Sequence, residues 1–131
     1  MRTEQSQSPL VHYLRQPSAT SVGDLLAEAI TFHSPVTDYH GRADVAHLFA
    51  AIANVLRDVK VERALLTSGG VTTFLTARVE QEAISGVLDE RVDAIGEVVE
   101  ATLLLRPYSA LRIAIGHMQT LLSNDPLPSA R

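Results

Sequence analysis

The sequence of 131 residues contains no cysteine. Disulfide bonds, thiolate nucleophiles and cysteine-ligated metal sites are therefore excluded. A cluster of lysines and arginines is also missing, and the formal net charge is −4. Because nucleic-acid binding depends on cationic contacts to phosphates, we expect no nucleic-acid partner.

Long apolar runs are missing as well. The run ATLLL stops at Arg106, far short of the roughly 20 residues that a membrane-spanning helix needs. The N-terminal stretch MRTEQSQSPL is polar and lacks the apolar segment of a signal peptide. We therefore expect no membrane partner and a cytoplasmic location.

The length and composition are typical of one globular domain. Apolar residues make up 46% of the chain and charged residues 20%, which is unlike a disordered protein. A chain of 131 residues is long enough to close one hydrophobic core. We expect a flexible leader at 1–9, one domain at 10–123 and a flexible, proline-containing tail at 124–131.

The N-terminal part predicts two short helices. PLVHYLRQP, which begins and ends with a proline, is consistent with a turn or two of helix. SATSVGDLLAEAI follows, with Ser21 as a candidate N-cap and with apolar residues at helical spacing. This second helix is expected to give way to an extended segment near Phe32, because Pro35 disfavours helical backbone at Ser34.

Two longer segments also have helical spacing. The first starts after Gly41 and has Asp44 in its first turn, where the helix dipole favours an acidic residue. Its apolar stripe consists of Val45, Leu48, Phe49, Ile52, Val55 and Leu56. The second starts after Pro107, and its stripe consists of Leu111, Ala114, Ile115, Met118 and Leu122.

Between these two helices the apolar period shortens to two. Four runs rich in Val, Thr and Leu, namely VKVERALLT, VTTFLTARVE, ISGVLDERVD and EVVEATLLLRP, are joined by short glycine- or polar-containing connections. Short connections make neighbouring strands antiparallel, so we predict a four-stranded meander. Grouped helices and grouped strands indicate an α+β fold, in which a bent sheet and its helices leave a concave space.

Two stretches resemble the nuclear transport factor 2-like superfamily, in its SnoaL-like, polyketide-cyclase-like branch. FHSPVTDYHGRADVAHLF resembles the step from strand into helix in that family, and GVLDERVDAIGEVVEATLLLRP resembles its last hairpin. The resemblance covers roughly residues 18 to 122. It implies a cone-like, curved antiparallel sheet with short additional N-terminal strands around a pocket, usually in a dimer. Members include both enzymes and non-catalytic binding modules, so the resemblance leaves activity open.

One family feature is absent from this sequence. In the related steroid isomerases, an aspartate directly before the proline of this step is the catalytic base, and here that position is Ser34. A serine without a base cannot replace a carboxylate that shuttles a proton. The resemblance therefore disfavours an isomerase of that mechanism, and any activity would be a different proton-transfer, isomerase- or cyclase-like reaction.

The clustered polar residues between His33 and His47 could form a metal site or an acid–base relay. His33 and His40 flank the predicted turn, while His47 lies on a helix, so we expect no metal site. Asp38, Tyr39 and His40 are adjacent, and three successive strand residues cannot all face one cavity. We favour a packed Tyr39 with its two neighbours facing outward. No glycine-rich phosphate loop is present, and we expect no cofactor.

Charges within apolar strand faces are further candidates. Glu90, Glu100 and Arg63 each share a predicted face with apolar residues. Inside a pocket such a carboxylate would be desolvated and its pKa raised, which suits a general acid or base. Alternatively, the three residues form ordinary cross-strand ion pairs on an exposed or dimer-buried face.

Two functions remain open. The first is a domain that binds a small, largely apolar molecule, polyketide- or steroid-like. Its candidate pocket residues are Phe32, Ser34, Tyr39, Phe49, Phe74, Glu90 and Glu100. The second is a non-catalytic module that forms a homodimer through its sheet. The candidate dimer rows are Val71, Leu75, Ala77 and Val79, and Val99, Ala101, Leu103 and Leu105.

Overall fold

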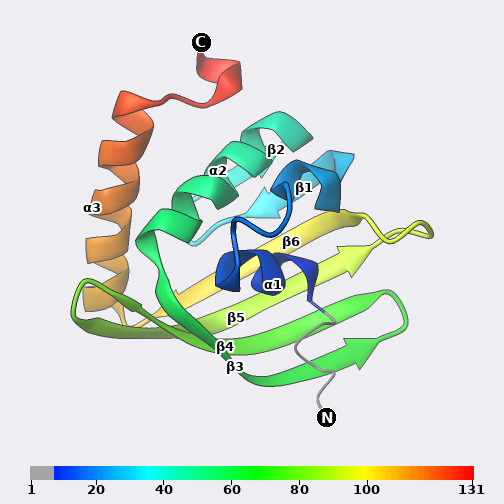
Figure 1. The fold of residues 1–131 in the computed structure, drawn as a ribbon, viewed down its shortest axis with the longest axis horizontal. Coiled ribbons are helices and arrows are strands. Elements are labelled where there is room, and N and C mark those ends of the chain that lie inside the picture. The colour runs from blue at the N-terminus through cyan, green and yellow to red at the C-terminus, as the bar shows by residue number, and fades with distance from the viewer. Residues whose placement is uncertain (1–7) are drawn as a thin grey trace.

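The computed structural model of this protein describes residues 8–131 (Figure 1). The expected leader at 1–9 therefore lies mostly outside the described residues. In chain order the elements are α1 (Pro9–Arg15), the 3-10 turn η2 (Val22–Leu25), β1 (Leu26–His33), β2 (Asp38–His40), α2 (Arg42–Val55), β3 (Arg57–Thr67), β4 (Gly70–Val79), β5 (Glu82–Val92), β6 (Val98–Arg106), α3 (Tyr108–Asn124) and η3 (Pro128–Ala130).

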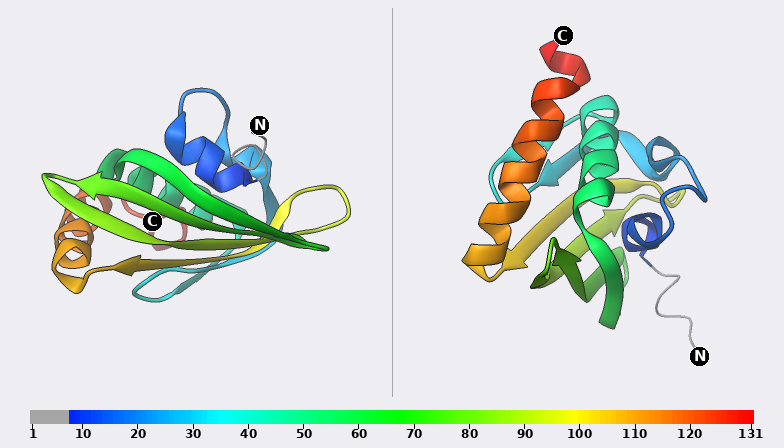
Figure 2. Two further views of the ribbon diagram at one scale, coloured as in Figure 1. Left: turned by 90° about the horizontal axis from the view of Figure 1, so that it is seen from below. Right: turned by 60° about the vertical axis from the view of Figure 1, so that its left-hand side comes forward.

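The six strands form one curved sheet in the order β2-β1-β6-β5-β4-β3 (Figure 2). The strands β3 to β6 pair as the predicted antiparallel meander. The two N-terminal strands extend the sheet at one edge, and β1 pairs in parallel with β6. The predicted α+β fold with a curved sheet and helices over one face is confirmed.

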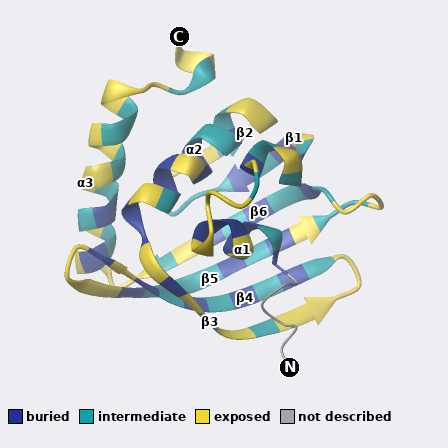
Figure 3. Ribbon diagram, viewed as in Figure 1, coloured by how far each residue is buried: buried dark blue, intermediate teal, exposed yellow. Residues whose placement is uncertain are grey.

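The core lies between the sheet and its helices (Figure 3). Strand β4 shows the alternation most clearly, because every second residue from Val71 to Val79 is buried and the residues between them are more exposed. The buried side chains of α2, including Val45, Phe49 and Ile52, cover this inner face. Gly41 begins α2 with a φ of 94°, a backbone conformation that glycine adopts without steric cost.

The helix predicted over Ser21–Ala29 is wrong. Only Val22–Leu25 form a 3-10 turn, and the chain is extended from Leu26 to His33. Ser21 precedes the turn but makes no capping hydrogen bond with its side chain. Leu26, Ile30 and Phe32 are fully buried in strand β1, so pairing with β2 and β6 overrides the helix propensity of LLAEA.

The predicted dimer rows, apart from Val99, lie on the inner face of the sheet. Val71, Leu75, Ala101 and Leu103 are buried beneath the helices. A β-bulge explains part of the error in β6, where Arg91 pairs with Glu100 but the next pair is Val92 with Val98. The bulge shifts the alternation by one residue, so that Val98 and Ala101 are both buried.

The tail after α3 folds back along α2. The backbone N–H of Ser129 donates to Oδ1 of Asp44 at 3.0 Å, and the Ser129 hydroxyl donates to Oδ2. Nε2 of His47 lies 2.7 Å from the carbonyl oxygen of Asp125. These contacts place residues 125–131 against the domain.

Two glycine substitutions test how closely β5 packs against β6 and how open the surroundings of Gly116 in α3 are. A Cβ at Gly86 in β5 would lie 1.9 Å from the backbone oxygen of Leu104, whereas a Cβ at Gly116 in α3 would meet nothing within 4 Å. We expect Gly86→Ala to lower the free energy of unfolding by about 1–3 kcal/mol or more, as overpacking does. We expect Gly116→Ala to raise it by about 0.5–1 kcal/mol through helix propensity. Urea unfolding measures both, and an unchanged stability in Gly86→Ala would contradict the β5–β6 packing.

Candidate functional site

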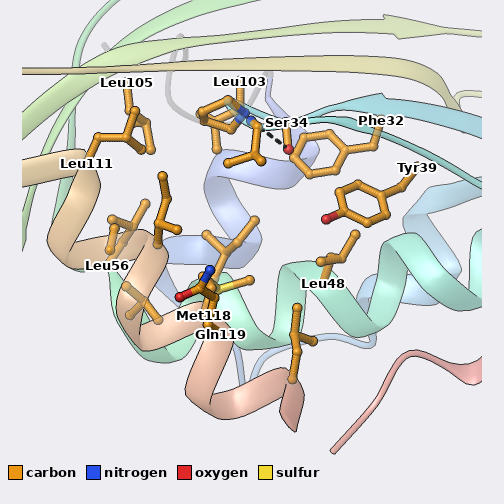
Figure 4. Close-up of a pocket in the computed structure, with 17 residues that line it drawn as sticks. Phe32, Ser34, Tyr39, Leu48, Leu56, Leu103, Leu105, Leu111, Met118 and Gln119 are labelled. Carbon is orange, nitrogen blue, oxygen red and sulfur yellow. Dashed lines mark hydrogen bonds between the residues drawn. The ribbon is translucent and has the colours of Figure 1, made fainter. Parts of the chain in front are cut away.

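A cavity of about 230 Å³ lies between the inner face of the sheet, α2 and α3 (Figure 4). The turn between β1 and β2 completes its wall. The lining side chains are mostly aliphatic or aromatic: Phe32, Ser34, Pro35, Val36, Tyr39, Leu48, Ile52, Val55, Leu56, Leu103, Leu105, Leu111, Ala114, Ile115, Met118, Gln119 and Leu122. Pockets that hold small apolar molecules have this kind of wall.

Helix α3 contributes the wall opposite the sheet. All five residues of its predicted apolar stripe, from Leu111 to Leu122, line the cavity. Of these five, Ala114 is buried and the others are half-buried. The stripe therefore faces the cavity rather than a fully packed core, which explains why a strongly apolar helix face remains partly accessible.

Aromatic side chains form the end of the cavity near β1 and β2. The ring of Tyr39 stacks on that of Phe32, with centroids 6.5 Å apart and planes at 25°. Phe32 also contacts Phe49, at 4.7 Å between centroids. Phe49 is fully buried behind Phe32 and does not line the cavity. The structure thus brings Phe32 and Tyr39 to the cavity and uses Phe49 to support them.

Ser34 lines the cavity, but its hydroxyl belongs to the β1–β2 turn. Its Oγ donates to the carbonyl oxygen of Thr37 at 2.8 Å and accepts from the amides of Val36 and Thr37 at 3.1 and 3.0 Å. This is the hydrogen-bonding pattern by which serine stabilises a turn. Ser34 therefore holds the Pro35 loop in place, and its hydroxyl is not free for a ligand.

The polar groups of the cavity wall are few. Across residues 8–131, the lining contains no Asp, Glu, His, Lys or Arg. The remaining polar side chains are those of Tyr39 and Gln119. A wall of this kind can bind a neutral molecule, and the described part of it supplies no carboxylate or imidazole to move a proton.

Glu90 is fully buried but lies outside this cavity. Its Oε2 accepts from the backbone N–H of Leu10 at 3.0 Å, and its Oε1 accepts from the hydroxyl of Ser8. The Ser8 oxygen in turn accepts from the N–H of Val11 and caps α1. Glu90 therefore ties the start of α1 to strand β5.

Burial sets the acidity of Glu90. Desolvation of the carboxylate raises its pKa from 4.5 to about 7, and nearby Asp89 adds to this. The hydrogen bonds from Ser8 and Leu10 act in the opposite direction but are weaker. The sequence-based expectation of a desolvated carboxyl is met at Glu90, but at a structural position beneath α1 and not in the cavity.

Glu100 lies on the outer face of the sheet, opposite the cavity. Its Oε2 is 2.8 Å from Nε2 of His33, whose Nδ1 is 2.8 Å from Oδ1 of Asp38. The hydrogen bond to Asp38, followed by that to Glu100, raises the pKa of His33. Arg91 adds a longer ion pair to Glu100 at 3.8 Å. The expectation that Glu100 lines the pocket is not met, because Glu100 shares the outer face of β6 with the exposed Leu104, opposite the buried Ala101 and Leu103.

Phe74 also lies on the outer face. The guanidinium carbon of Arg63 sits 4.2 Å from the centroid of its ring. This is a cation–π contact across β3 and β4, so both residues stabilise the outer surface and do not line the cavity.

The clustered histidines do not converge. His33 bridges two carboxylates, His40 lies 3.3 Å from the hydroxyl of Thr31, and His47 contacts the tail. Within residues 8–131 no group of three or more His, Asp or Glu side chains could hold a metal ion. In the same part of the chain, no helix is long and apolar enough to cross a membrane.

Sequence reasoning missed much of the cavity wall. It placed Leu48, Leu103 and Leu105 in a core or a dimer face, and it did not consider Gln119. The alternation in β6 carried the signal for Leu103 and Leu105, because both share a face with the buried Ala101. The position of Gln119 one residue after Met118 on α3 gave no comparable signal.

Comparison with known proteins identifies the fold. No protein-family profile and no curated protein matches this chain. Solved structures do match. An uncharacterized protein with a cystatin-like fold from Silicibacter pomeroyi superposes with a TM-score of 0.83 at 17% sequence identity, covering 95% of this chain and 89% of that one.

Two further structures are similar. A steroid delta-isomerase from Pseudomonas aeruginosa gives a TM-score of 0.81 at 21% identity and covers 95% of each chain. A nuclear transport factor 2-like protein of unknown function from Cytophaga hutchinsonii gives 0.62 at 13% identity, covering 79% of this chain and 88% of that one. The chain therefore has the nuclear transport factor 2-like fold, as the two sequence motifs predicted. At these identities the likeness shows the fold and not the activity.

The raised pKa of Glu90 predicts how stability depends on pH. Because its carboxyl has a pKa of about 7 in the fold and 4.5 as a free side chain, the folded state binds the proton more tightly. This contribution to stability is fully present below about pH 4.5 and is lost as the pH rises through about 7, by about 3 kcal/mol in total. We expect Glu90→Gln to remove this loss.

Urea unfolding between pH 4 and pH 8 measures the effect. The control is Glu82→Gln, which removes an exposed carboxyl from the same strand and should keep the wild-type pH profile. Identical pH profiles for Glu90→Gln and the wild type would contradict the assignment.

Proposed function

We propose that this protein is a cytoplasmic domain that binds a small, largely apolar and neutral molecule in the cavity between the sheet, α2 and α3. The observation that carries the proposal is the apolar, uncharged wall of that cavity. Apolar surface that leaves water contributes about 25 cal/mol per Å², so an apolar ligand gains affinity over most of its surface. A charged ligand would lose its hydration without gaining an ionic partner.

The proposal favours binding over catalysis by an aspartate base. One similar structure is a steroid delta-isomerase. In the resemblance drawn from the sequence, enzymes of that kind have their catalytic aspartate at the position that Ser34 occupies here. Here the Ser34 oxygen is engaged by Val36 and Thr37, and Glu90 and Glu100 lie away from the cavity. A SnoaL-like relationship remains a prediction from the sequence.

Filling the cavity tests the proposal. We expect the two-ring hydrocarbon tetralin to bind the wild type, and Ala114→Leu to weaken binding at least about tenfold because the new side chain occupies ligand space. Ala50→Leu adds the same side chain at an exposed position of α2 and should bind like the wild type. Isothermal titration calorimetry measures both. No binding to the wild type, or equal binding to Ala114→Leu, would count against the proposal.

Self-association through the outer face of the sheet is a second candidate function. Phe74, Val87 and Leu104 lie side by side on β4, β5 and β6, and Leu104 is 58% exposed. Around this row the face carries both signs of charge, with Arg63 over Phe74 and Arg91 paired with Glu100. In a two-fold pair the same patch meets itself, so opposite charges can match across the interface.

A sedimentation experiment tests the dimer. We expect the wild type to be dimeric at micromolar concentration and Leu104→Arg to be monomeric, because a two-fold interface would receive the new charge twice. Ile95→Arg is the matched control, since Ile95 is 79% exposed but lies in the β5–β6 turn. A monomeric wild type, or a dimer that survives Leu104→Arg, would argue against this interface.

A further inference from the structure

The hydroxyl of Tyr39 is an unpaired polar group in an otherwise apolar cavity. Figure 4 shows the side chain reaching from β2 with its oxygen directed into the space between β6 and α3. Within residues 8–131 this hydroxyl has no hydrogen-bond partner. Among these residues, Thr73 Oγ1 is the one fully buried side-chain oxygen or nitrogen without a partner. The unpaired Tyr39 oxygen is therefore not fully buried.

The other two polar side chains of the wall, Ser34 and Gln119, are less suited to bond a ligand in the cavity. The Ser34 hydroxyl makes three hydrogen bonds within its own turn. Gln119 is exposed on α3, so its amide can bond to water when the cavity is filled. A ligand that displaces water from the Tyr39 hydroxyl without replacing the hydrogen bond leaves a polar group unsatisfied, which costs binding free energy.

The size of the cavity limits the ligand. An engineered cavity of about 150 Å³ holds benzene, and pockets for drug-sized ligands span about 300–1,000 Å³. The cavity here, about 230 Å³, lies between these values. A body of one or two rings therefore fits, whereas a four-ring steroid would extend out of the space. This narrows the range of ligands considered from the sequence, which included steroid-like molecules.

We propose that the ligand is a neutral molecule with one or two apolar rings and a single acceptor oxygen, such as a ketone, and that Tyr39 determines this specificity. The phenol donates its proton in a hydrogen bond to the ligand oxygen, while Phe32 holds the Tyr39 ring from behind. The inference rests on the proposed binding function but goes beyond it, because an apolar cavity alone would not distinguish a ketone from the corresponding hydrocarbon.

The test compares two ligands that differ by one carbonyl group. Isothermal titration calorimetry is used to measure the binding of α-tetralone and tetralin to the wild type, Tyr39→Phe and Tyr108→Phe. Tyr39→Phe keeps the ring and removes only an unpaired hydroxyl, so the variant is expected to fold with unchanged thermal stability. Tyr108 is 71% exposed at the start of α3 and serves as the matched control.

We expect Tyr39→Phe to weaken α-tetralone binding at least about fivefold, as loss of a hydrogen bond to a buried carbonyl does, and to leave tetralin binding unchanged. Tyr108→Phe should alter neither. If tetralin and α-tetralone are affected equally, or if neither is affected, Tyr39 is not the specificity residue, although the binding function stands. If neither ligand binds the wild type, the binding function itself fails. A four-ring steroid ketone that binds more tightly than α-tetralone would overturn the size limit.

Discussion

The structure depends on the burial of the concave inner face of the six-stranded sheet. Its apolar side chains, including Leu75, Leu88 and Leu103, leave water only because α1, α2 and α3 pack over them. A curved sheet and straight helices do not match in shape along their whole length. Near α1 side chains fill the space, whereas between the sheet, α2 and α3 they leave the cavity. The site is thus a consequence of how the core closes.

The charged side chains among the candidate residues lie outside the cavity, either beneath α1 or on the outer face of the sheet. Glu90 is the only carboxyl of residues 8–131 that is fully buried. It accepts hydrogen bonds from Ser8 and Leu10 at the N-terminus of α1 and so is not available to a ligand. His33 and Glu100 lie on the outer face and join β1 to β6. Because these groups are engaged elsewhere, the cavity keeps an uncharged wall. That wall favours recognition by shape and by one hydrogen bond over acid–base chemistry.

Much of this architecture could be predicted from the sequence. Periods of two and of 3.6 residues gave the meander, α2 and α3, and the apolar stripe of α3 correctly marks one cavity wall. The segment LLAEA was misread because local propensity favours a helix there, and only pairing with β6 makes it a strand. Glu100 was misplaced because the alternation in β6 does not say which of its two faces lies inward, and packing against the helices decides this. Such tertiary effects leave no mark in the local pattern.

One measurement tests the central claim that the cavity binds an apolar molecule. The sequence has two methionines, and Met118 lines the cavity. In a protein labelled with ¹³C at the methionine methyl groups, titration with tetralin should shift the Met118 signal in a saturable manner. A Met118 signal that does not move, or that moves without saturation, would contradict binding in the cavity.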